Sequence, residues 1–299
     1  MPSTYKLKEP VPVGATSSPF CVGGRGVPSF ECFRILCGSV DIEIKSTGQT
    51  SKFRHCYISQ QSRRPNKKII EKIVDVVFDG TLSLSDVETF LKKTRGKNHD
   101  FWEELRNELL FCIFAKKRDR NVEAFLHLYR MLELISVALP LIYARKLDDY
   151  RDAMKFIKSL SKNNRDSDLA VLRYFTEEIA KGNSTFSRLQ IDYSFDGIDT
   201  RVATEIETQL SKYIFSDEKI KHTFFMTPNE GVSVGFSSVS LFIASCRNRL
   251  FHNASTKNNF KLDPLHGAEP ICSVLIEPSL NWFGIILSEI MKSESSKYI

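Results

Sequence analysis

Most of the chain beyond residue 67 carries apolar residues at the spacing of amphipathic helices. Apolar side chains recur three and four residues apart, which places them on one face of an α-helix. The segments with this pattern are 67–78, 83–91, 98–113, 121–143, 148–160, 166–180, 200–215, 237–253 and 278–292. They predict a mainly α-helical protein, in which Pro140 kinks or ends the helix at 121–143.

The first 60 residues differ, because they contain short β-branched or aromatic runs that are typical of strands. The runs are Phe30–Leu36, Val40–Ile44 and Phe53–Ile58, and turn residues stand between them at Gly38-Ser39 and Thr47-Gly48. We therefore expect a small β-containing region at the N-terminus.

A glycine-rich segment, Gly23-Gly24-Arg25-Gly26, precedes these runs. Glycines hold a phosphate group when a strand enters the loop and a helix leaves it. Because no helix is predicted after Gly26, this segment is interpreted as a flexible loop.

These patterns divide the sequence into three parts. Residues 1–62 form the β-containing region, residues 63–97 form connecting helices, and residues 98–299 form a helical domain. The first boundary falls in a basic, polar stretch from Ser62 to Lys68, whose composition is typical of a linker.

Composition and charge favour a soluble protein that binds a polyanion. The chain has 299 residues, 42% of them hydrophobic, and a formal net charge of +6 at pH 7. The N-terminus lacks the basic and apolar regions of a secretory signal. The longest apolar stretch, Leu132–Ala144, is interrupted by Glu133 and Pro140 and is too short to cross a bilayer. We expect a cytoplasmic protein without membrane contact.

The seven cysteines are an odd number and stand mostly among apolar neighbours. This usage is typical of reduced cytoplasmic thiols. Cys32, Cys37, His55 and Cys56 could be combined into a zinc site, but their spacing matches no common pattern of zinc ligands.

The candidate chemistry lies at the end of segment 237–253, where Arg247, Asn248 and Arg249 are followed by His252. On a helix, Asn248 and His252 share a face, whereas Arg247 lies about 140° round from His252. Arg247 therefore reaches the same phosphate only through its long side chain or from a partner subunit.

These residue types can cleave RNA by attack of the ribose 2′-hydroxyl on the adjacent phosphate. His252 would move the proton, because an imidazole titrates near neutral pH. Arg247 would stabilise charge on the phosphoryl oxygens with paired donors, and Asn248 would orient the histidine or donate a further hydrogen bond. No pair of carboxylates at metal-binding spacing stands near this cluster, so we expect neither a metal nor a cofactor.

The segment resembles the signature of HEPN domains, an Arg followed four to six residues later by a His, often with a polar residue directly after the Arg. Here four residues separate Arg247 from His252, and Asn248 is the polar residue. The resemblance covers the helical part from Asn98 to the C-terminus and is closest in segment 237–253. The β-containing N-terminal region lies outside it.

HEPN domains are helical bundles, and their ribonuclease members pair two such motifs across a dimer cleft and leave 2′,3′-cyclic phosphate ends. The resemblance thus implies a C-terminal HEPN-like bundle, a homodimer, and a metal-independent endoribonuclease with Arg247, Asn248 and His252 as catalytic residues. Many similar proteins are prokaryotic toxins or phage-defence effectors. The partners implied are RNA, such as tRNA or mRNA, and a regulatory antitoxin or sensor protein.

Further cations are candidates for RNA binding because clustered positive charge attracts phosphate regardless of base sequence. They are Arg249 and the junction cluster Lys116, Lys117 and Arg118. A solvated turn is an equal alternative for the junction cluster.

Two alternatives to an enzyme remain open. A non-catalytic HEPN-like module would use the same bundle to bind RNA, a nucleotide or a protein. Alternatively, Arg247 and Arg249 only solvate a helix C-terminus, where cations suit the helix dipole, and His252 caps it.

Overall fold

The structure, a computed structural model, describes residues 5–10, 16–58, 68–145, 147, 149–160, 168–216, 224–228, 230–251, 259–260 and 267–298. It is mainly α-helical, as the sequence predicts. Contacts group the chain into two compact units, one formed by Met1–Phe111 with Phe283–Ile299 and one formed by Cys112–Trp282. The boundaries predicted after residues 62 and 97 are drawn from sequence patterns. The two units are defined by contacts, and the first of them contains both ends of the chain.

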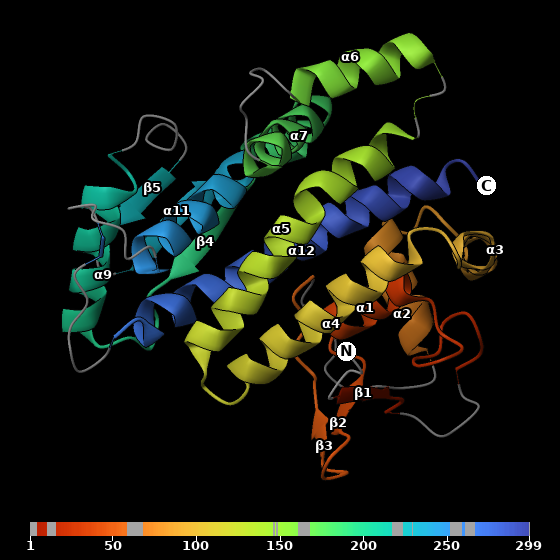
Figure 1. Cartoon of the computed structure of the whole chain (residues 1–299), viewed down its shortest axis with the longest axis horizontal. Coiled ribbons are helices and arrows are strands. Elements are labelled where there is room, and N and C mark those ends of the chain that lie inside the picture. Colours follow the sequence, from red (N-terminus) through yellow and green to blue (C-terminus); the bar gives the residue numbers. More distant parts are fainter. Residues whose placement is uncertain are drawn as a thin grey trace. The chain divides into compact units, whose positions relative to one another are not determined.

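The first unit combines a three-stranded sheet with helices (Figure 1). Its elements are β1 (Tyr5–Lys8), α1 (Pro28–Leu36), β2 (Asp41–Ile44), β3 (Thr50–Lys52), α2 (Ile69–Phe78), α3 (Leu84–Thr94), most of α4 (His99–Lys116) and the end of α12 (Glu269–Ser295). The sheet is antiparallel in the order β1-β2-β3. The predicted β-containing region is therefore present, with β1 as a strand that the apolar runs did not indicate.

Two of the three predicted strands are wrong. The run Phe30–Leu36 is helix α1, which begins at Pro28 and has all nine of its residues buried. Burial on every side removes the amphipathic spacing that identifies a helix, and Pro28 at the first position already has a helical φ angle. The run Phe53–Ile58 follows β3 and is not a strand, whereas β2 confirms the run Val40–Ile44.

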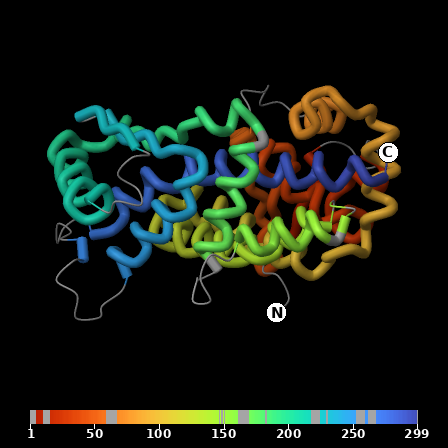
Figure 2. The backbone as a smooth tube through the Cα atoms, turned by 90° about the horizontal axis from the view of Figure 1, so that it is seen from above, coloured from red at the N-terminus to blue at the C-terminus, as the bar shows by residue number. Residues whose placement is uncertain are grey.

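The C-terminal helix α12 is longer than the sequence predicts. It begins at Glu269 rather than at Pro278, which lies inside it, and Figure 2 shows it as one continuous helix. Within the first unit its last turns contact segments that are distant in sequence. A Cβ atom added at Gly284 would lie 2.8 Å from the Ile58 side chain, and Lys292 forms an ion pair with Asp79. This end of α12 therefore completes the core of the first unit.

The second unit is built around helix α7. Its elements are α5 (Asn121–Ala144), α6 (Tyr150–Leu160), α7 (Asp168–Gly182), α8 (Ser184–Arg188), β4 (Gln190–Ser194), α9 (Thr200–Tyr213), β5 (Phe224–Thr227), β6 (Gly231–Gly235), η1 (Phe236–Ser238) and α11 (Val239–Phe251). Helix α7 packs against α5, α6 and α11. The predicted helices correspond to these elements, and α5 continues through Pro140 to Ala144 instead of ending there.

A second antiparallel sheet, in the order β4-β6-β5, was not predicted. Strand β4 alternates exposed and buried residues, with Ile191 and Tyr193 facing the core. The Tyr193 hydroxyl lies 3.3 Å from Ser279 Oγ on α12, and the Tyr193 ring lies 4.9 Å from that of Phe242 on α11. The sheet thus anchors the start of α11.

Two described helices, α5 and α12, reach the length and hydropathy of a membrane span. The apolar window is 56% buried in α5 and 72% buried in α12, and buried core helices pass the same test. This finding is weak support for a membrane span.

Candidate functional site

Helix α11 carries the predicted catalytic cluster at its C-terminal end. It follows β6 and the short turn η1, whose Phe236 carbonyl accepts a 2.9 Å hydrogen bond from Trp282 Nε1. The apolar residues of the helix, among them Phe242, Ile243 and Cys246, are buried. The cluster therefore begins where a fixed, buried helix reaches the surface.

The end of α11 is held against α5 by aromatic rings. The Phe251 ring lies 6.2 Å from the Phe125 ring, and one turn further along α5 the Tyr129 ring meets the guanidinium of Arg247. The Arg247 Cζ atom lies 4.7 Å from the Tyr129 ring centroid, within cation–π range. Arg247 is half-buried, so this contact restricts the position of its guanidinium.

Arg247 and Asn248 contact each other directly. Arg247 Nη1 donates a 3.2 Å hydrogen bond to Asn248 Oδ1, and the Asn248 side chain is exposed. These two predicted catalytic residues are thus together in the structure. The third, His252, lies outside the described residues.

Tyr129, which the sequence did not single out, lies against Arg247, and Glu133 on the same helix is hydrogen-bonded to the Tyr129 hydroxyl. Tyr129 is buried except for 8% of its surface, and Glu133 one turn later is exposed. Burial raises the pKa of the Tyr129 hydroxyl, as do the charge of Glu133 and a hydrogen bond with it, whereas Arg247 acts in the opposite direction. The hydroxyl therefore stays protonated at neutral pH. The sequence signal that could have indicated this contact is a Tyr and a Glu four residues apart, which lie on one helix face.

The predicted RNA-binding cations occupy different environments. Lys116 is half-buried and pairs with Glu277 at 2.5 Å, whereas Lys117 and Arg118 are exposed, and Arg118 Cζ lies 4.2 Å from the Phe114 ring centroid. The junction cluster directly precedes α5, at the end of that helix that contacts α11. Arg249 is half-buried, and its backbone carbonyl accepts the Phe260 N–H at 3.1 Å.

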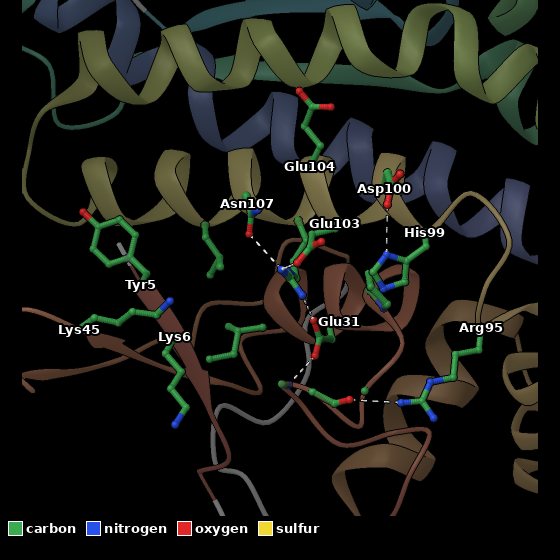
Figure 3. A pocket seen from close by; sticks show the side chains of 17 residues that line it. Tyr5, Lys6, Glu31, Lys45, Arg95, His99, Asp100, Glu103, Glu104 and Asn107 are labelled. Atoms are coloured by element: carbon green, nitrogen blue, oxygen red, sulfur yellow. Dashed lines mark hydrogen bonds and ion pairs between the residues drawn. The ribbon is translucent and has the colours of Figure 1, made fainter. Parts of the chain in front are cut away.

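The first unit contains a separate cavity of about 800 Å³ beside the glycine-rich segment (Figure 3). Strand β1, the start of α1 and helix α4 complete its walls. The charged side chains around it are Lys6, Lys45, Arg95 and Arg106 together with Glu31, Asp100, Glu103 and Glu104. Equal numbers of both signs give this cavity no net preference for an anion.

The glycine-rich segment is not free to hold a phosphate. Helix α1 follows it directly, which corrects the expectation that no helix leaves this loop. However, Glu31 accepts the Gly23 N–H at 2.6 Å and an Arg106 N–H at 2.7 Å, and Glu9 accepts the Val22 N–H at 2.9 Å. These carboxylates occupy the N–H groups of Val22 and Gly23 and would repel a phosphate. The loop is therefore hydrogen-bonded to two carboxylates of the same unit.

Within the described ranges, no group of three or more His, Cys, Asp or Glu side chains is placed to hold a metal ion. Among the four residues that the sequence offered as zinc ligands, Cys32 is buried with its Sγ 4.0 Å from the Trp102 carbonyl oxygen, whereas Cys37 contacts Cys56. These four residues therefore do not gather around one point.

The cluster on α11 has the chemistry of an anion site. It presents a guanidinium fixed on an aromatic face, an exposed amide beside it and cations at the adjoining end of α5. A guanidinium binds phosphoryl oxygens through paired N–H donors in its own plane. Comparisons with known protein families, with curated proteins and with solved structures found no match for this chain.

Proposed function

We propose that this protein is a metal-independent endoribonuclease that acts as a homodimer, with Arg247, Asn248 and His252 as its catalytic residues. The role that we assign to it is that of a toxin or phage-defence effector. The observation that carries the proposal is the placement of Arg247, whose guanidinium lies against Tyr129 and is hydrogen-bonded to Asn248 at the surface end of α11.

The reaction is an internal transesterification. The ribose 2′-oxygen attacks the adjacent phosphorus, its proton passes to an imidazole, and the bond from phosphorus to the 5′-oxygen breaks. The leaving oxygen takes up a proton from an imidazolium, so the products are a 2′,3′-cyclic phosphate and a 5′-hydroxyl. Arg247 supports this step because charge accumulates on the phosphoryl oxygens as the 2′-oxygen bonds to phosphorus.

Binding of RNA is supported by cations near the cluster. Lys117 and Arg118 are exposed in the turn before α5, and Arg249 stands beside the proposed catalytic pair on α11. Exposed cations contribute sequence-independent affinity that falls as salt rises. A noncatalytic binding module would keep this affinity without turnover, so cleavage separates the two functions.

The first test is incubation of the purified full chain with tRNA and total RNA in excess EDTA. We expect fragments with 2′,3′-cyclic phosphate and 5′-hydroxyl ends, identified by their response to phosphatase and polynucleotide kinase. A matched substrate with a 2′-O-methyl group at the mapped cleavage position should stay intact, because it lacks the nucleophile. Salt-sensitive binding without any cleavage would favour the non-catalytic module, and cleavage that needs Mg²⁺ and leaves 5′-phosphates would refute the mechanism.

Tyr129 is expected to position Arg247. Tyr129→Leu removes the ring under the guanidinium and should lower the rate of RNA cleavage about fivefold to tenfold, the equivalent of a cation–π contact of about 1 kcal/mol. Tyr129→Phe keeps the ring and is the matched control, with a rate close to that of the parent. The measurement is the rate at saturating RNA together with the thermal midpoint of each variant. Equal losses in both variants would show that the hydroxyl, not the ring, matters.

A further inference from the structure

Cys37 and Cys56 stand opposite each other in the first unit. Strands β2 and β3 pair Asp41 with Lys52, and the same antiparallel register continues beyond the strand ends. The Phe53 N–H donates to the Val40 carbonyl at 3.4 Å, and the Tyr57 N–H donates to the Leu36 carbonyl at 2.8 Å. Counting inward from that last pair, Cys37 at the end of α1 faces Cys56.

The two backbone segments also touch at the neighbouring position. A Cβ atom added at Gly38 would lie 2.5 Å from the carbonyl oxygen of His55, so the two backbone segments are in contact beside the cysteines. Cys37 lies at the end of α1 rather than in the ladder, so its fit to a bridge rests on the close backbone approach at Gly38 and on the contact between the two thiols. Disulfide bridges need Cα atoms about 4.4–6.8 Å apart, which segments in such close contact can provide without large backbone movement.

The two thiols are in contact, and both residues are partly exposed. A hydrogen bond with Cys56, followed by burial, raises the pKa of the Cys37 thiol well above its ordinary value. Both residues are half-buried, whereas Cys32, Cys112, Cys246 and Cys272 are buried. Cys21 is the other half-buried cysteine and therefore provides an internal comparison.

We infer that Cys37 and Cys56 form a redox-active dithiol, a modification site that a low-molecular-weight disulfide converts into an intramolecular disulfide. The bridge would join the end of α1 to the segment after β3. That segment includes Ile58, which packs against Gly284 of α12, so the bridge would act on a packed part of the first unit.

The step is thiol–disulfide exchange and balances without any further oxidant. Cys56 loses its proton to solvent and attacks, and the exchange balances equally with the two cysteines in the opposite order. The Cys56 thiolate bonds to one sulfur of the small disulfide, whose S–S bond breaks and whose other half leaves as a thiolate. Cys37 then loses its proton to solvent and attacks the Cys56 sulfur, which releases the second small thiolate. Two protein thiols are oxidised, and one small disulfide is reduced to two thiols that take up the two protons.

The test equilibrates the reduced full chain with mixtures of reduced and oxidised glutathione, followed by acid quenching, alkylation and tryptic mass spectrometry. We expect the peptide of residues 35–45 linked to that of residues 55–63, and cleavage after Arg34 separates Cys32 from this product. Links to Cys21 should be less abundant by about tenfold or more, because it has no such placement. In guanidinium this preference should disappear.

The variants make the outcome decisive. Cys56→Ser should give no linked peptide, whereas Cys21→Ser should give the same linkage as the parent at the same glutathione ratio. If the native chain keeps both cysteines unlinked at the most oxidising ratio, or if links to Cys21 or between other cysteines dominate, the inference is wrong. The inference does not depend on RNA cleavage.

Discussion

Replacing His252 with alanine should lower the rate of RNA cleavage by about 10²- to 10⁴-fold, the contribution that a positioned acid or base makes. Arg247→Ala should lower it by about 10²- to 10³-fold, because charge on the phosphoryl oxygens loses its paired donors. Arg247→Lys should fall between this variant and the parent, since a lysine keeps the charge without the planar fork. Arg201→Ala is the matched control, because it removes an exposed arginine elsewhere in the second unit.

The readout that identifies the residue roles is the rate at saturating RNA, with thermal midpoints to show that each variant is folded. Arg201→Ala should cleave like the parent. If Arg247→Ala and His252→Ala both retain the parental rate while folded, cleavage comes from another site or from a contaminant. A loss confined to affinity would favour the non-catalytic module.

Mixing the two inactive variants tests the dimer. If Arg247 acts across a twofold axis with His252 of the other subunit, each mixed dimer contains one intact site and one doubly damaged site. Random exchange of subunits should then restore about a quarter of the parental activity. If both residues act within one chain, every site stays damaged and no activity returns.

The proposed cluster could be put forward from sequence to the extent that its members are neighbours along the chain. Arg247 and Asn248 stand side by side on one helix, so periodicity and residue chemistry indicate them together. Tyr129 and Glu133 belong to another helix, and only tertiary packing brings the Tyr129 ring to Arg247. Spacing alone relates Glu133 only to residues of α5 itself, such as Arg130 three positions earlier, because side chains on the same helix are the neighbours that spacing reveals.

The fold shows the same limit. Helices with one exposed face, such as α2 and α9, follow from apolar spacing, whereas the continuous apolar run of α1, which is buried on all sides, predicts a strand. Strand β4 alternates in a way that spacing could have indicated, but its five residues are too few to stand out from the surrounding helices. The sequence pattern predicts a helix start at Pro278, which lies inside α12.

Arg34 shows why the N-terminal region folds as it does. Its side chain is fully buried, and all five N–H donors have acceptors in three other segments. Two donors meet the Glu9 carboxylate at 2.7 and 3.0 Å, one meets the Phe20 carbonyl at 3.1 Å, and two meet the Ser39 carbonyl at 2.8 Å and hydroxyl at 3.3 Å. Because Glu9 also accepts the Val22 N–H at 2.9 Å, this arginine ties β1, the glycine-rich segment and the start of β2 to α1.

Arg34→Ala should therefore lower the free energy of unfolding of the first unit by about 3–5 kcal/mol, because it leaves the Glu9 carboxylate without its cation and two carbonyls without their donor. Arg34→Lys should lower the free energy of unfolding less than Arg34→Ala does, because lysine keeps the charge. It still destabilises, because it has three donors for five acceptors. Hydrogen exchange of peptides from the first unit, measured across a urea series, reports this unit separately from the second. Arg34→Met combined with Glu9→Leu should destabilise less than the sum of the two single changes, because the double variant buries no unpaired charge. Additive effects, or an Arg34→Ala loss below about 1 kcal/mol, would instead mean that water replaces the missing donors and that the buried pair does not hold these segments together.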